Sequence, residues 1–231
     1  MTPTTRLPLV HRGTVPLPQF QPLPVARRRE AFDHPDWIFE PKHDGFRCIA
    51  YVEHGRCRLV SRNGNEFKSF GSLNAAVADE LKGHSAVLDS EIVSLDNTGK
   101  SQFYELFFHR GEARLCAFDL LWCDGQDLHY ASLLERKRRL RLLIRYPDRL
   151  FYCDHLEQFG KRLFQIACEH DLEGIVAKHK NDPYTPGTKW LKIRNQQYSQ
   201  WAGRDELFER ERESDPDTLW GACTLVCEDA A

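Results

Sequence analysis

The chain reads EPKHDGFR from Glu40 to Arg47, and the interpretation of the whole sequence depends on this stretch. Lys42 stands at the mouth of a predicted strand, a tight Asp44-Gly45 turn follows, and Arg47 lies just beyond the turn. Glycine adopts backbone conformations that other residues avoid, so such a turn lets the backbone approach a ligand closely. Taken alone, the stretch fits an ordinary charged loop equally well, and its meaning depends on the segments around it.

Strand and helix patterns extend outward from this stretch. Residues 47–52 and 57–61 predict the two arms of a β-hairpin whose turn contains Gly55. Further strands are expected at 86–95, 115–122, 174–177 and 190–193, and helices at 70–81, 133–144 and 156–170. Hairpins mixed with scattered helices predict an α+β fold with largely antiparallel sheets and flanking helices.

Acidic side chains occur in or beside three predicted strands, where an unpaired carboxylate is costly. Asp89 and Glu91 are two residues apart, so both face the same side of their strand and suit a metal or a ribose contact. Asp119 lies within a continuous apolar run, and a structural partner explains it as well as a functional role does. Glu173 directly precedes the strand at 174–177.

Cations accompany these acids. Lys192 and Arg194 alternate along one strand, so both side chains point to the same face. A lysine, cations that offset phosphate charge and carboxylates that bind a divalent metal together suit phosphoryl or nucleotidyl transfer to Lys42. A lysine is a poor nucleophile while protonated, and neighbouring cations and a metal would favour its neutral form.

These segments resemble the covalent nucleotidyltransferases, and most closely the nucleotidyltransferase domain of ATP-dependent DNA ligases. Residues 42–47 are similar to the KxDGxR motif of that family. Four further matches follow in family order, namely 88–93 for motif III, Phe118-Asp119 for motif IIIa, Glu173-Gly174 for motif IV and 191–194 for motif V. Five ordered matches are far more specific than one motif. Ser90 and Arg194 depart from the family pattern, which usually has glycine and lysine there.

The resemblance implies an ATP-grasp-like ligase adenylation fold and a role for each matched residue. Lys42 would attack the α-phosphate of ATP and carry AMP as a phosphoramidate. The implied nucleotide contacts are Glu40 near the adenine amino group, Arg47 on the ribose, Glu91 near the ribose or metal, Phe118 stacked on adenine, and Lys192 and Arg194 on the α-phosphate and pyrophosphate. Glu91 and Glu173 would hold the metal, and Arg62 would contact the 5′-phosphate of a nick.

The function that the resemblance implies is that of an ATP-dependent DNA ligase in DNA repair and recombination. AMP would pass from Lys42 to a 5′-phosphate, and a 3′-hydroxyl would then displace it. The expected cofactors are ATP and Mg²⁺ or Mn²⁺, and the expected partner is nicked double-stranded DNA. Two alternatives stay open, namely an RNA ligase or capping-type nucleotidyltransferase, and a non-sealing adenylate-binding subunit that needs a partner protein.

Length and charge limit the organisation of the chain. With 231 residues, 41% of them hydrophobic, and a formal net charge of −2, wholesale disorder and a strongly polybasic nucleic-acid binder are excluded. We expect a Pro/Arg-rich extension at 1–29, a nucleotidyltransferase domain at 30–200 and an acidic tail at 201–231. Only 37 residues follow Arg194, fewer than the ~50 of a small domain. We therefore expect no OB domain, and an OB-type or DNA-end-binding protein as a candidate partner.

Eight cysteines are present, and none forms a CxxC pair. We expect reduced thiols, mostly buried as small hydrophobic groups, and hence a cytoplasmic protein. No apolar run reaches the ~18 residues of a membrane span, and no signal peptide is recognised, so no membrane contact is expected. Cys223 and Cys227, four residues apart, give a weak hint of a metal site.

Several other residues are expected to have structural roles. The basic run at 135–141 is interpreted as a solvated helix face rather than a DNA-binding patch. His43 is expected to be an ordinary loop residue. Tyr198 and Trp201 are expected to pack the end of the chain onto the domain rather than to stack on bases.

Overall fold

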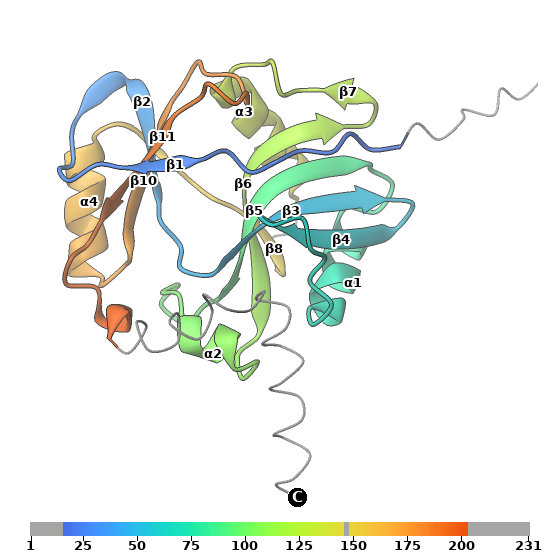
Figure 1. Cartoon of the computed structure of the whole chain (residues 1–231), viewed down its shortest axis with the longest axis horizontal. Helices are drawn as coiled ribbons and strands as arrows, with labels where there is room; N and C mark the ends of the chain where they lie inside the picture. Colours follow the sequence, from blue (N-terminus) through green and yellow to red (C-terminus); the bar gives the residue numbers. More distant parts are fainter. Residues whose placement is uncertain (1–15, 146–147, 203–231) are drawn as a thin grey trace, which may run out of the picture.

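The computed structural model describes residues 16–145 and 148–202, and their strands form two sheets flanked by helices. Figure 1 shows one sheet on each side of the molecule, with strand β2 (His34–Pro41) of one leading into β3 (Phe46–Glu53) of the other. Residues 42–45 form this connection, which we call the 42–45 connection. The fold thus places Lys42 where the two sheets meet.

The first sheet has the strand order β1-β11-β10-β2-β9. Besides β2 it contains β1 (Val25–Arg27), β11 (Trp190–Arg194), β10 (Gly174–His179) and β9 (Leu156–Gln158). Val176 at the middle of β10 lies opposite Glu40 on one side and opposite Lys192 on the other. Residues in one row across a sheet share a face, so Glu40 and Lys192 project to the same side.

The second sheet has the order β4-β3-β5-β6-β7, and β8 pairs with β6 beside that path. Its remaining strands are β4 (Arg56–Ser61), β5 (Ala86–Ser94), β6 (Ala113–Cys123), β7 (Gln126–Asp127) and β8 (Leu150–Tyr152). Within the described residues, only β1 with β11 and β6 with β8 are parallel neighbours. The predicted α+β fold with largely antiparallel sheets is confirmed.

Four helices in the described part of the chain cover these sheets. They are α1 (Gly71–Glu80), which packs on β4 and β6, α2 (Phe103–Phe107) beside β5, α3 (Leu133–Leu143) on β6, and α4 (Gly160–Glu169) on β10 and β2. A 3₁₀ turn, η1 (Ser199–Trp201), follows β11. None of the helices among the described residues is long and apolar enough to cross a membrane.

Strand β3 is apolar along almost its whole length because both of its faces are covered. Cys48 and Ala50 face a core that includes α1, whereas Ile49 and Tyr51 face a second core that includes Trp190. The second core joins β3 to the first sheet, so hydrophobic burial holds the two sheets together on one side of the connection.

One predicted helix begins four residues later than expected. The sequence predicts a helix from residue 156, but Leu156–Gln158 form strand β9 against β2, and α4 begins at Gly160. Gln158 has a φ of 68°, which ends the strand and is incompatible with a continuous helix. A Cβ on Gly160 would lie 2.3 Å from the carbonyl oxygen of Phe32, so glycine permits the close approach at the start of α4.

The described part of the Pro-rich lead-in lies against the domain. Leu17 and Leu23 are buried, and Val25–Arg27 pair in parallel with Trp190 to Lys192 of β11. A boundary at residue 29 and another at residue 200 stay predictions. Cys223 and Cys227 lie outside the described residues.

Candidate active site

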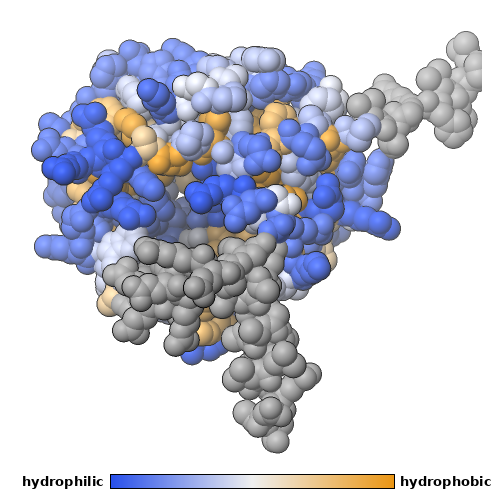
Figure 2. All heavy atoms as spheres, in the orientation of Figure 1, coloured by the Kyte–Doolittle hydropathy of each residue, from blue (hydrophilic) through white to orange (hydrophobic). Residues whose placement is uncertain are grey.

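All nine side chains to which the family resemblance assigns a role line one cavity of about 680 Å³ between the two sheets. They are Glu40, Lys42, Arg47, Arg62, Glu91, Phe118, Glu173, Lys192 and Arg194. Figure 2 shows hydrophilic side chains over most of the visible face, which is hollowed between the sheets. The sequence motifs, up to 154 positions apart in the chain, therefore converge on one site.

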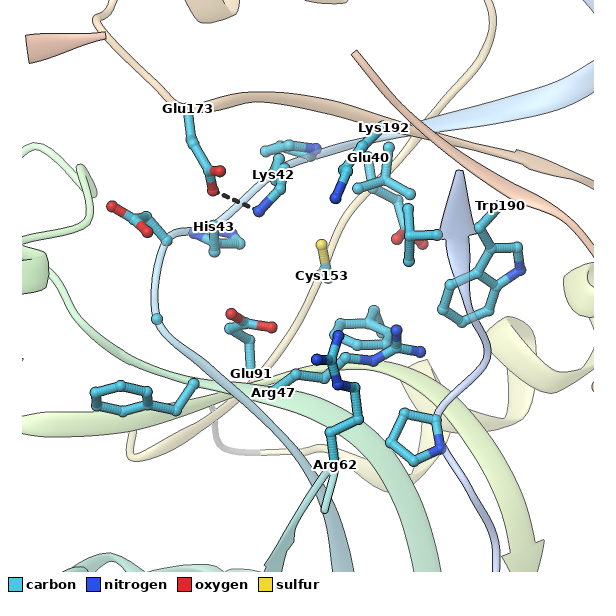
Figure 3. A pocket seen from close by; sticks show the side chains of 18 of the residues that line it. Glu40, Lys42, His43, Arg47, Arg62, Glu91, Cys153, Glu173, Trp190 and Lys192 are labelled. Carbon is cyan, nitrogen blue, oxygen red and sulfur yellow. Dashed lines mark hydrogen bonds and ion pairs between the residues drawn. The ribbon is translucent and has the colours of Figure 1, made fainter. Parts of the chain in front are cut away.

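Lys42 and Glu173 both line this cavity, and in Figure 3 their side chains point toward one another and are joined by a hydrogen bond. Lys42 Nζ donates a hydrogen bond to Glu173 Oε2 at 2.5 Å, and the backbone N–H of Lys42 donates to the carbonyl of Gly174 at 2.9 Å. The Glu173 side chain is 3% exposed and that of Lys42 is 20% exposed. The end of β2 is thus fixed against the start of β10, and the partly exposed side chain of Lys42 lines the cavity.

The Asp44-Gly45 turn is shaped by the protein itself. A Cβ on Gly45 would lie 2.0 Å from the backbone oxygen of Ile92, so glycine allows the connection to pass close to β5. Asp44 N–H donates to Ser101 Oγ, and Asp44 Oδ2 accepts a hydrogen bond from Tyr198 at 3.0 Å. The close approach that the sequence assigns to a ligand is therefore made to a neighbouring strand.

Arg47 is held by a buried carboxylate. Its Nε and Nη2 donate to the two oxygens of Asp89 at 3.1 and 2.7 Å, and its Nη1 donates to the carbonyl of Leu23. Burial opposes the charge on Arg47, but Asp89 raises the pKa of the guanidinium above its usual value. Tyr184 also donates to Asp89 at 2.7 Å. Asp89 shares a strand face with Glu91 as predicted, but its oxygens are occupied by protein donors.

Glu91 and Glu173 are the carboxylates that could hold Mg²⁺. Burial raises the pKa of Glu91 to about 7, against the opposing effects of Lys42 and Arg47. Burial also raises the pKa of Glu173, despite its hydrogen bond from Lys42. A divalent cation would offset this unfavourable charge burial, and Mg²⁺ commonly uses one or two carboxylates together with substrate phosphates and water. The residues present therefore fit such an ion.

Glu40 forms a buried ion cluster with two lysines, neither of which is among the site residues expected from the sequence. Lys137 Nζ donates to Glu40 Oε1 at 2.5 Å, and Lys178 Nζ forms an ion pair with Oε2 at 2.5 Å. Burial would raise the pKa of Glu40, but Lys137 and Lys178 together lower it below its ordinary value. Glu40 is therefore a carboxylate with both oxygens engaged, at the edge of the cavity.

Aromatic rings lie beside this ion cluster. Phe118 and Trp190 meet edge to face with centroids 5.8 Å apart, and both line the cavity. Lys178 Nζ lies 3.9 Å from the Trp190 ring centroid and 4.4 Å from that of Phe118. Flat apolar surface next to fixed polar groups is typical of a pocket that binds a heteroaromatic ring. Trp190 had no assigned role, although its position beside the motif V lysine was a usable signal.

Cations form another part of the cavity lining. Lys192 and Arg194 both face it, as their alternation predicts, and Arg62 is exposed at its rim. Burial and the charges of Arg194 and Lys42 lower the pKa of Lys192. Arg194 Nε lies 4.0 Å from Glu173 Oε1, and its guanidinium lies 4.7 Å from the Trp201 ring centroid. Such like charges held together favour a polyanionic ligand.

The basic run on α3 is not a uniform solvated face. Arg136 is 0% exposed and donates from Nε and Nη2 to both oxygens of Asp119, at 2.7 and 2.8 Å. Lys137 is 1% exposed. Only the neighbouring arginines, such as Arg138 and Arg141, match the predicted solvated face. Of the two explanations for Asp119, the structure supports a structural role, because this acid in an apolar strand pairs with Arg136 of the adjacent helix.

Two smaller predictions concern residues near the connection. Tyr198 donates to Asp44, and Trp201 Nε1 donates to the carbonyl of Asn195 at 3.0 Å, so both pack the described end of the chain onto the domain. His43, expected to be an ordinary loop residue, instead lines the cavity beside Cys153. The spacing of the histidines could not predict that His43 lines the cavity, because the neighbours of His43 come from segments far away in the sequence.

Comparison with known proteins adds the family. A family model described as the ATP dependent DNA ligase domain matches residues 24–194. The chain belongs to this family. Its match covers every motif that defines the cavity, and it includes strand β1.

Relatives of this chain include longer proteins that are described as multifunctional. A multifunctional non-homologous end joining DNA repair protein LigD of Mycobacterium tuberculosis is 33% identical over 161 residues, which are 68% of this chain and 21% of LigD. An SPbeta prophage-derived DNA ligase-like protein LigB of Bacillus subtilis is 30% identical over 190 residues, 78% of this chain and 68% of LigB. The chain thus spans about a fifth of the length of its LigD relative.

Solved structures agree with the family. A mycobacterial DNA ligase D complexed with ATP and MES is similar with a TM-score of 0.69 and 30% identity, over 76% of this chain and 60% of that one. The ligase domain of Mycobacterium tuberculosis LigD is similar with a TM-score of 0.66 and 29% identity, over 74% and 59%. The predicted fold, that of a ligase nucleotidyltransferase domain, is confirmed.

Proposed function

We propose that this ligase domain transfers AMP from ATP to Nζ of Lys42, then to a 5′-phosphate at a DNA nick, and then forms the phosphodiester bond. The observation that carries the proposal is the cavity itself, in which the amine of Lys42 faces a buried carboxylate, a cation cluster and two aromatic rings. The ATP complex of the similar mycobacterial ligase D supports the choice of nucleotide.

In the first step Lys42 Nζ forms a bond to the α-phosphorus while the bond from that phosphorus to the bridging oxygen of pyrophosphate breaks. The ammonium of Lys42 must first lose a proton. Glu173 Oε2, which accepts the hydrogen bond from Nζ, is the nearest acceptor, and the raised pKa of Glu173 suits it to receive this proton. Lys192 and Arg194 would offset the charge on the departing pyrophosphate.

The remaining residues orient the nucleotide. Glu40 would accept from the adenine amino group, Phe118 would contact the base, and Arg47 would contact the ribose with the donor capacity that Asp89 leaves. Glu91 and Glu173 would hold Mg²⁺, which supplies charge neutralisation on the phosphates. The sharing of Glu173 between Lys42 and the ion means that proton loss from Lys42 and ion binding are linked.

In the second step a 5′-phosphate oxygen attacks the AMP phosphorus, and the bond to Lys42 Nζ breaks with return of a proton to the amine. Arg62, exposed at the cavity rim, would bind this 5′-phosphate. In the third step the 3′-hydroxyl loses its proton, attacks the activated phosphorus and releases AMP. The names of the LigD relatives, multifunctional non-homologous end joining proteins, support a place for this chain in end-joining repair.

Sealing of a nick by the isolated chain tests the proposal. The chain is incubated with Mg²⁺, ATP and duplexes that carry a single nick in DNA or in RNA. We expect sealed DNA, loss of sealing in Lys42→Arg, and normal sealing in the control Lys161→Arg, whose lysine is exposed on α4. Self-labelling without sealing would favour the partner-dependent subunit, and preferential sealing of RNA would favour an RNA ligase.

A further inference from the structure

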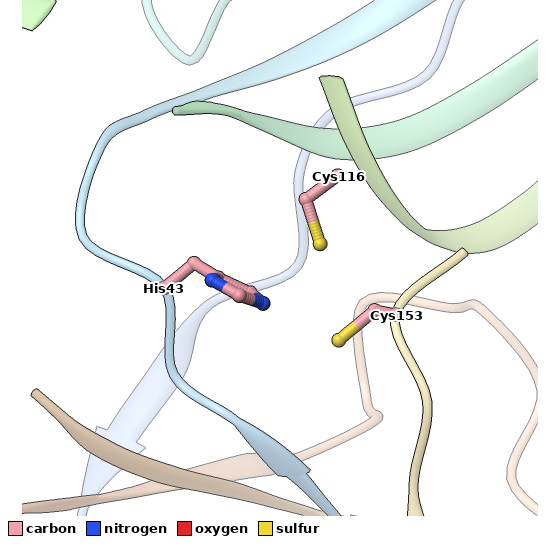
Figure 4. Close-up of side chains that lie close together, drawn as sticks. All are labelled: His43, Cys116 and Cys153. Atoms are coloured by element: carbon pink, nitrogen blue, oxygen red, sulfur yellow. The ribbon is translucent and has the colours of Figure 1, made fainter. Parts of the chain in front are cut away.

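Three side chains that suit a soft metal ion converge beside the 42–45 connection (Figure 4). A ring nitrogen of His43 and the sulfur atoms of Cys116 and Cys153 all lie within 4.8 Å of one another. The three residues come from separate segments, namely the connection, strand β6 and the residue that follows β8. The proposed AMP transfer uses none of them.

Each of the three side chains is positioned by the fold. Cys116 lies in a central strand, opposite Glu91 on one side and Phe151 on the other. The N–H of Cys153 donates to the carbonyl of Ala117 at 2.8 Å. The His43 ring packs edge to face on Phe151 with centroids 5.8 Å apart. A metal ion would therefore find its ligands already gathered, with little ordering left to do.

The donor set selects the class of ion. Thiolate and imidazole ligands are typical of Zn²⁺, whereas Mg²⁺ takes oxygen ligands. Cys116 is 0% and Cys153 is 3% exposed, so water competes little for the sulfur atoms.

We propose that His43, Cys116 and Cys153 form a Zn²⁺ site whose fourth coordination position opens into the cavity of Lys42. His43 and Cys153 line that cavity, whereas Cys116 lies behind them. Structural zinc sites have four protein ligands, and sites with three keep a position for water or substrate. The site is thus expected to exchange its ion, and its three ligands do not include Glu91 or Glu173, although Glu91 lies opposite Cys116.

Cobalt substitution tests this site without reference to ligase activity. The probe is Co²⁺, added anaerobically to the reduced chain carrying Cys223→Ser and Cys227→Ser, so that the cysteines of the tail cannot contribute. We expect the visible d–d absorption of tetrahedral Co²⁺ and a thiolate-to-cobalt charge-transfer band, both removed by one equivalent of Zn²⁺. Cys116→Ser and Cys153→Ser are each expected to lower the charge-transfer band by about half, because each removes one of two sulfur ligands.

Two further variants guard against misfolding and against a different site. His43→Ala changes a half-buried residue of the connection and is expected to weaken Co²⁺ binding at least ~10-fold, with an unchanged far-ultraviolet circular dichroism spectrum. Cys123→Ser is the matched control, since Cys123 belongs to a separate group with His84 and Asp124, and its spectrum should be unaltered. A missing charge-transfer band in the reference chain, or the same band after both Cys116 and Cys153 are replaced, would overturn the proposal.

Discussion

Lys42 Nζ donates to Glu173 Oε2 at 2.5 Å, although 131 positions separate the two residues in the chain. The pair joins the end of β2 to the start of β10, and it holds the proposed nucleophile as an ion-paired amine. In the proposed AMP transfer this pair would have to part, so Glu173 would have two successive partners, the lysine and then the metal with its nucleotide. Such an exchange would link the state of the nucleophile to the arrival of its substrate.

Replacement of Glu173 tests that exchange. Glu173→Gln keeps the shape of the side chain but removes the proton acceptor and a metal ligand, and we expect the rate of Lys42 adenylation to fall at least ~100-fold. The rate is measured from the label that α-³²P-ATP leaves on the denatured chain. Glu169→Gln, an exposed acid at the end of α4, is the control and should label normally. Equal adenylation rates in the two variants would show that Glu173 takes no part in the reaction.

Glu91 gives the domain a pH-dependent stability. Its pKa is raised to about 7, so the native state binds a proton that the unfolded state has lost, and stability falls as pH rises from about 4.5 to about 7. Glu91→Gln removes this loss. In urea denaturation we expect the free energy of unfolding of the variant to exceed that of the parent by about 3 kcal/mol at about pH 8. The difference should be much smaller at about pH 5. A pH-independent difference would contradict the assignment.

Helix α3 contains a buried cation and an exposed one in consecutive positions, Lys137 and Arg138. Lys137→Met leaves Glu40 with Lys178 as its remaining ion-pair partner, and we expect a loss of about 3 kcal/mol in the free energy of unfolding. Arg138→Met removes an exposed ion pair, and its effect on the free energy of unfolding should be much smaller than that of Lys137→Met. Similar effects of the two substitutions would mean that this helix face is solvated throughout.

Gly45 offers a test of the connection. Gly45→Ala places a Cβ 2.0 Å from the oxygen of Ile92, so β3 or β5 must shift, at an expected cost of about 2–3 kcal/mol. Gly71→Ala is the matched control, because a Cβ at Gly71, the first residue of α1, meets nothing within 4 Å. Thermal unfolding should show a large loss for the first substitution and no loss for the second. Unchanged stability of Gly45→Ala would show that the turn needs no glycine.

A strand could be predicted from the sequence where its alternating residue pattern and the turn beside it lie in the same short segment. The hairpin of β3 and β4 is one example, because its six residue pairs flank a turn at His54 and Gly55. Strand β9 is the counterexample. Leu156–Gln158 continue the apolar spacing of α4, and only their pairing with β2, more than a hundred residues earlier, makes them a strand.

The candidate site was readable as a set of motifs, but not as a set of contacts. The order of Lys42, Glu91 and Glu173 in the chain pointed to one cavity, and the structure brings them there. The partners of Glu40 were not readable, because Lys137 lies 97 positions away on a helix whose other cations are exposed. The burial of Arg136, in contrast, could have been predicted from Asp119, because an acid in a buried strand requires a buried cation nearby.

Locating the adenylate on the chain tests directly whether Lys42 is the nucleophile. The protein is incubated with ATP and Mg²⁺, denatured and digested at neutral or alkaline pH, and its peptides are analysed by mass spectrometry. We expect AMP on Nζ of Lys42, and an unmodified chain when Lys42 is replaced by arginine. AMP attached to a different residue, or a Lys42→Arg chain that still acquires AMP, would contradict this expectation.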